Sequence, residues 1–177
     1  MDIHDWLKTL KNPIHVIGNG PLVKNLKENT SGSTVRFNNF ELSEEAGWKT
    51  THWVTCAWSD VKDRPLFYPL SPWTKDSISA KYSKEFEKRT EKIPVFTETN
   101  NHILRWFPDA PHNPADTWPS TGFCFLALLN YFDFQDVTID GFNGLSGGHY
   151  WNPTHAHDHQ NTANRELNII QNEFKFL

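Results

Sequence analysis

The segment from Trp118 to Asn143, WPSTGFCFLALLNYFDFQDVTIDGFN, constrains the fold more than any other part of the chain. A Pro-Ser-Thr-Gly turn opens an apolar run whose length and continuity predict a buried helix from Gly122 to Phe132. The next stretch, DVTIDGF, predicts a strand that ends at Gly141. The hydroxyl-rich turn before the helix is either an ordinary cap or part of a ligand site.

Short strands and helices alternate along the rest of the chain. Ile14 to Ile17 predicts a strand that runs into a glycine turn, and Pro21 suits the first turn of a helix through Val23 to Lys27. The same signals predict further strands at Thr34–Phe37, in THWVTCAW, at IPVFT and in ILRWF, and helices at Asp5–Leu10 and in TANRELNIIQNEFKFL. The proline-rich, charged region from Lys62 to Thr90 is interpreted as an excursion over the surface. This order predicts an α/β fold, a single three-layer Rossmann-like domain with a mostly parallel sheet spanning residues 1–177.

Composition limits the partners of such a domain. The chain has 177 residues, 37% of them apolar, with 13 Phe and 8 Trp, so aromatic side chains carry much of the core. A net charge of -4 argues against nucleic acid as the main partner. The two cysteines, Cys56 and Cys124, do not form a disulfide framework. Neither a signal peptide nor a membrane-length apolar run is visible, so we expect a cytoplasmic protein; peripheral association with membranes and the oligomeric state stay open.

Three predicted strands end in turns that could bind a ligand. The turns are Gly18-Asn19-Gly20, the one at Asn38, and Gly141-Phe142-Asn143. Ligands of parallel sheets lie at the carboxyl ends of the strands, where these turns would meet. Gly18 to Gly20 opens a predicted helix, a place that favours phosphate, although a plain tight turn explains it equally well. The two asparagines either read a nucleobase or ribose, or simply cap their turns.

Four histidines follow in HYWNPTHAHDHQN: His149, His155, His157 and His159. They nearly match the H-x-H-x-D-H zinc signature, but Asp158 directly follows His157, where that signature needs a spacer. A general base that works near neutral pH is the alternative role, and we favour it over zinc.

Several stretches together resemble the animal-type sialyltransferases, glycosyltransferase family twenty-nine. VIGNGP, VRFNN and GWKTTHW resemble the long sialylmotif of that family, and WPSTGFCFLALLNYFDFQDVTIDGF resembles the short sialylmotif along its whole length. His149-Tyr150-Trp151 is similar to the aromatic motif, and His159 followed by Glu166 to the very short motif. Bacterial sialyltransferases of another family share the Gly-Asn-Gly-Pro turn and the strand-end asparagine.

This resemblance implies a sialyltransferase-type variant of the GT-A fold and transfer from a CMP-sugar to a glycan hydroxyl, with inversion and without a cofactor or an essential metal. The donor sugar would be sialic acid or a related acidic sugar such as Kdo. The matching positions imply that Asn19 and Asn38 contact the phosphate and ribose of CMP. They also imply that Ser120, Thr121 and Gly122 hold the same two groups and that His149 or Tyr150 binds the phosphate. His159 matches the base.

The chain also departs from the family. Asn164 stands where the family has the glutamate of the very short motif, and Glu166 comes later, so His157 is a second candidate for the base. The chain is also shorter than family members. Three alternatives therefore stay open: a CMP-sugar hydrolase, a non-catalytic CMP- or glycan-binding module, and a zinc hydrolase.

Overall fold

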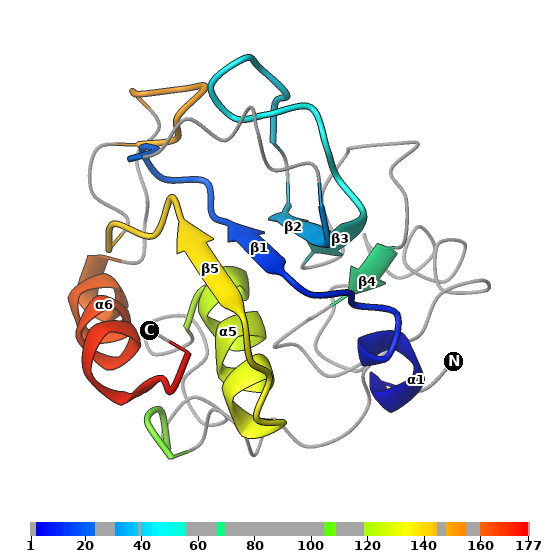
Figure 1. Ribbon diagram of the computed structural model, residues 1–177. Coiled ribbons are helices and arrows are strands. Elements are labelled where there is room, and N and C mark those ends of the chain that lie inside the picture. Colours follow the sequence, from blue (N-terminus) through cyan, green and yellow to red (C-terminus); the bar gives the residue numbers. More distant parts are fainter. Residues whose placement is uncertain are drawn as a thin grey trace, which may run out of the picture.

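The computed structural model describes residues 3–23, 31–38, 40–55, 67–69, 105–108, 119–144, 148–154 and 160–176. Strand β1 (Ile14–Ile17) lies inside their sheet, and all four of its residues, three of them apolar and β-branched, are buried. It pairs with β2 (Ser33–Phe37) on one side and β5 (Val137–Asp140) on the other. Beyond β2 follow β3 (His52–Thr55) and β4 (Phe67–Pro69), which gives the order β4-β3-β2-β1-β5 (Figure 1).

All four strand pairings are parallel, which confirms the predicted α/β fold. Every residue of β1 and β2 is buried, so both faces at the centre of the sheet are covered, as a three-layer arrangement requires. One face contributes Val16, Val35 and Phe37 to the main core. The other face carries the buried Arg36, which donates to the carbonyls of residues 46, 47 and 49 and thereby holds that loop over the strands.

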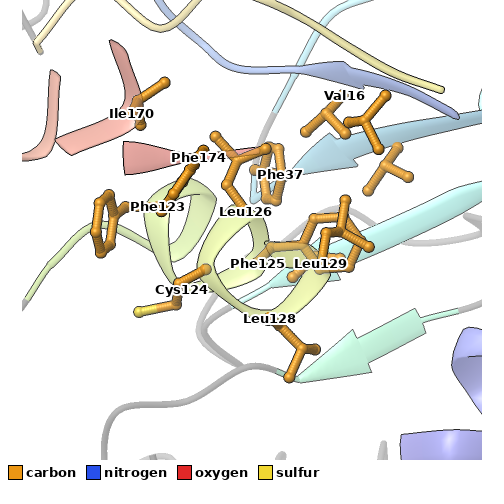
Figure 2. Packing of buried hydrophobic residues seen from close by; sticks show 14 of the residues in the cluster. Val16, Phe37, Phe123, Cys124, Phe125, Leu126, Leu128, Leu129, Ile170 and Phe174 are labelled. Carbon is orange, nitrogen blue, oxygen red and sulfur yellow. The ribbon is translucent and has the colours of Figure 1, made fainter. Parts of the chain in front are cut away.

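Helix α5 (Thr121–Tyr131) packs on the first face and is buried from Gly122 through Leu129. Its predicted limits differ from the observed ones by a single residue at each end. Figure 2 shows side chains of α5 between those of the strands, such as Val16 and Phe37, and those of the C-terminal region, Ile170 and Phe174. The continuous apolar sequence of α5 therefore reflects a helix with packing partners on nearly all sides.

Two further helices complete the described structure. Helix α6 (Gln160–Glu173) is amphipathic and contributes Ile169 and Ile170 to the core. Helix α1 (Ile3–Leu7) inserts the fully buried Trp6, whose ring meets Phe125 edge-on at 6.0 Å. No helix among the described residues combines the length and apolar character that crossing a membrane would need.

Some sequence predictions differ from the structure or fall outside it. The sequence predicts an excursion over the surface where the structure has strand β4, because Pro69 argues against a strand. The strand forms nevertheless, since it is at the sheet edge, where proline is tolerated. Residues 21–23 are not helical, and the remainder of the helix predicted through Lys27 lies outside the described residues, as does the IPVFT strand. The described residues 105–108 of the ILRWF segment form a turn.

Candidate functional site

The turns that follow β1 and β5 pack against each other at the carboxyl edge of the sheet. The N–H of Gly18 donates to the carbonyl of Asp140 at 2.8 Å, and the N–H of Gly20 donates to that of Gly141 at 2.9 Å. A Cβ atom on Gly141 would lie 2.5 Å from the Gly18 carbonyl oxygen, so the two backbones meet with no room for a side chain. Two of the three turns singled out in the sequence are thus in direct contact.

Asn19 ties this pair of turns to its neighbours. Its side-chain Nδ2 donates to the carbonyl of Phe37 at 3.1 Å, and its own carbonyl accepts from the N–H of Tyr150 at 3.0 Å. Asn38 ends β2 in the left-handed conformation, with φ 46°, and its carbonyl accepts from Trp53 Nε1 at 2.7 Å. Both predicted asparagines therefore lie at the same sheet edge, and each is hydrogen-bonded to a neighbouring segment.

The Pro-Ser-Thr-Gly turn reaches the same place from the helix layer. Ser120 is the N-cap of α5, and its hydroxyl accepts from the N–H of Phe123 at 3.2 Å. A Cβ on Gly122 would come 2.7 Å from the ring of Phe142, the residue after Gly141. The start of α5 therefore lies against the β5 turn, with the positive end of the helix dipole at the edge where the strands end (Figure 1).

Glu166 on α6 points back at this turn. The residue is 5% exposed, and its carboxylate accepts from the N–H of Ser120 at 2.6 Å and from the Ser120 hydroxyl at 2.7 Å. Burial raises the pKa of Glu166 to about 7, while the two hydrogen bonds from Ser120 act in the opposite direction. In the sequence only the motif resemblance pointed to Glu166; its contact with Ser120, 46 positions earlier, has no local signal.

The segment that contains His149 and Tyr150 is the last described part of the candidate site. The ring of His149 stacks on Trp151, with the centroids 4.3 Å apart. The hydroxyl of Tyr150 donates to the carbonyl of Glu41, and burial raises the pKa of this phenol, partly offset by the nearby Arg36. Tyr150 thus adjoins the β1 turn through its backbone, while its hydroxyl is directed to the loop that follows β2.

The two candidate bases, His157 and His159, lie outside the described residues, as does His155. Helix α6 begins at Gln160, directly after His159 in the sequence. The carbonyl oxygen of Ala163 is 3.3 Å from the position that a Cβ on Gly144 would occupy. The described first turn of α6 is therefore close to the chain that leaves β5. Among the described residues, no three His, Cys, Asp or Glu side chains are grouped as metal ligands.

Comparison by sequence gives no match for the chain, whereas comparison of the fold does. No protein-family model matches the chain, and no curated protein matches it either. Among solved structures, the chain is similar to the sialyltransferase CstII from Campylobacter jejuni in complex with the substrate analogue CMP-3FNeuAc. The TM-score is 0.62 at 12% identity, over 94% of this chain and 80% of that one. A second structure, of CST-II in complex with a trisaccharide acceptor and CMP, gives a TM-score of 0.60 at 11% identity, over 92% and 78%.

The chain shares the fold of these sialyltransferases. The sequence motifs resemble the animal-type family, but the structural likeness is to the bacterial enzyme and does not single out family twenty-nine. The predicted fold is thereby confirmed.

The contact between Gly122 and Phe142 gives a first testable expectation. Alanine at Gly122 would push against the Phe142 ring, and overpacking of this kind typically destabilises a protein by about 1 to 3 kcal/mol. Urea denaturation of Gly122→Ala measures the loss. In a Phe142→Ala background, Gly122→Ala should cause almost no further loss of unfolding free energy. An unchanged loss there would mean that the new methyl group does not clash with the Phe142 ring.

Proposed function

We propose that the protein is a glycosyltransferase that moves sialic acid, or a related acidic sugar such as Kdo, from a CMP-sugar to a glycan hydroxyl. One observation supports this most: the Gly18–Gly20 turn, the start of α5 and the Gly141 turn converge at one sheet edge. Parallel sheets bind ligands at this edge, and the shared fold is that of sialyltransferases solved with CMP-3FNeuAc and with CMP.

The start of α5 suits the charge that develops on departing CMP. Of the N–H groups that open this helix, that of Ser120 donates to Glu166 and that of Phe123 to the Ser120 hydroxyl. Thr121 and Gly122 supply the remaining two, and in the proposed reaction they bind the phosphate of the leaving group. Fixed N–H donors at a helix N-terminus stabilise such negative charge without rearrangement.

The other steps of the proposed reaction use the remaining predicted residues. Asn19 and Asn38 flank the nucleotide, and His149 or Tyr150 completes the phosphate contacts. A histidine, His159 first and His157 second, removes the proton of the acceptor hydroxyl as the glycosidic bond forms. The sugar inverts, and no metal takes part.

A thermal-shift screen with CMP, CDP, UDP and GDP tests the nucleotide choice. We expect CMP to raise the melting temperature and the other three to do so weakly or not at all, because a ligand stabilises the state that binds it. Stabilisation by UDP or GDP without CMP would contradict the proposal.

A matched pair of variants localises the binding. Asn19→Ala removes an amide from the proposed site, whereas Asn168→Ala removes one from the exposed face of α6. Only the first should weaken CMP binding, by about tenfold for one lost polar contact.

Product analysis then separates transfer from its alternatives. With CMP-sialic acid or CMP-Kdo and a panel of glycans, transfer yields an inverted glycoside. Release of free sugar at the same rate with and without glycan would indicate a hydrolase, and CMP binding without turnover would indicate a binding module. Stoichiometric zinc in purified protein, with loss of activity on its removal, would favour the zinc hydrolase.

A further inference from the structure

Glu166 is a buried carboxylate beside the turn that we propose binds a phosphate. Its carboxylate lies against the N-cap of α5, with both oxygens engaged by Ser120. A buried carboxylate is costly when ionised, and here it would also stand close to a phosphate bound at the same helix end. Its protonation state therefore bears on what the turn can bind.

Two hydrogen-bonding patterns are available to this pair. When Glu166 is ionised it can only accept, so the proton of the Ser120 hydroxyl is committed to it. When Glu166 is protonated, its O–H can donate to the Ser120 oxygen, which still accepts from Phe123 as well. The hydroxyl of Ser120 then no longer donates to Glu166, and it can donate its hydrogen bond to an anion at the start of α5. The carboxylate gains an O–H bond with a proton taken from solvent, and the O–H bond of Ser120 stays intact.

The surroundings of Glu166 bring its pKa close to neutral pH, so both protonation states are accessible there. Burial raises its pKa, and among the described residues only the two hydrogen bonds from Ser120 oppose this effect. The adjacent Arg165 on α6 lies over the ring of Phe107, with its guanidinium carbon 4.8 Å from the centroid. Arg105, in the segment that packs on α6, pairs with Glu173 at the far end of that helix at 3.1 Å.

We propose that Glu166 is a positioning residue that binds a proton when an anion binds at the start of α5, and so turns the Ser120 hydroxyl into a donor toward that anion. This role rests on the proposed function, in which the anion is the phosphate of a CMP-sugar. This proton-linked role is distinct from the one proposed for the histidine base.

The test compares nucleotide affinity at pH 6 and pH 8 in wild type, Glu166→Gln and Glu173→Gln. The ligand is CMP-3FNeuAc, whose phosphodiester and carboxylate do not titrate in this range. If only the protonated form binds well, wild-type affinity should fall about tenfold between these pH values, since a group with a pKa of about 7 is largely neutral at the first and ionised at the second. Glutamine mimics the protonated acid, so Glu166→Gln should bind equally well at both. Glu173→Gln makes the same change on the same helix away from the turn and should follow wild type.

Two further measurements keep the result interpretable. Every other titratable group is common to all variants, so the difference between wild type and Glu166→Gln isolates the glutamate. Calorimetry in two buffers at pH 7.5 should show more proton uptake on binding in wild type than in Glu166→Gln. The Ser120→Ala variant keeps the carboxyl group of Glu166 but lacks the hydroxyl of Ser120, so it should bind CMP-3FNeuAc weakly at both pH values.

The outcomes separate the role from the function on which it rests. Binding with the same pH dependence in wild type and Glu166→Gln overturns the role of Glu166 and leaves the proposed function standing. A tenfold pH dependence that persists in Ser120→Ala overturns the hydroxyl route. Failure of every variant to bind CMP-3FNeuAc at either pH overturns the proposed function and this role together.

Discussion

Alanine at Gly141 is expected to reduce the free energy of unfolding by roughly 3 kcal/mol or more, through backbone strain and a steric clash. Gly141 has φ 71°, a conformation that costs an alanine about 1 to 2 kcal/mol. The new Cβ would also lie 2.5 Å from the Gly18 carbonyl oxygen, and no rotation of a side chain relieves a contact with backbone. The two turns must separate, so binding of CMP should be lost as well. Urea denaturation and the thermal-shift assay measure the two effects.

Gly144 provides the matched control for this substitution. It has nearly the same backbone conformation, with φ 67°, but the nearest atom to its added Cβ would be the Ala163 carbonyl oxygen at 3.3 Å. Gly144→Ala should therefore show the conformational cost of about 1 to 2 kcal/mol with little more. Equal losses in the two variants would mean that the close approach of the β1 and β5 turns contributes nothing to stability.

The elements at the centre of the fold could be predicted because local sequence and burial agree there. In β1 and α5 most residues are apolar, and β1 is buried throughout and α5 from Gly122 to Leu129. The glycines at 18 and 141 mark the strand ends, and the parallel order then places both turns at one edge. Here the hydrophobic pattern and the tertiary contacts favour the same conformation.

The sheet edge could not be predicted in the same way. Strand β4 is three residues long and ends at Pro69, so neither length nor composition distinguishes it from a loop. It is a strand because it pairs in parallel with β3, a contact between distant segments. Such pairing overrides the weak local preference of a short sequence.

The candidate site likewise contains residues that could be predicted from the sequence and contacts that could not. Residues that adjoin strand ends, such as Asn19 and Gly141, could be placed by topology alone. The contacts between Glu166 and Ser120 and between Tyr150 and Glu41 join segments whose approach depends on how helices and loops pack. Tyr150 shows the consequence: its backbone bonds the β1 turn, and its hydroxyl bonds the backbone carbonyl of Glu41, a contact with no signal in the sequence.

Removal of the imidazole at His159 is expected to lower the rate of sugar transfer about 10² to 10⁴-fold, the usual contribution of a general base. Since the base acts on the acceptor hydroxyl, His159→Ala should keep the CMP affinity of wild type. Rates with a CMP-sugar and a glycan acceptor, together with CMP titration, separate these two effects. His157→Ala, two positions away, is the matched control and should retain most activity. Loss of transfer in His157→Ala alone would move the role to His157, and full activity in both variants would show that neither histidine is the base.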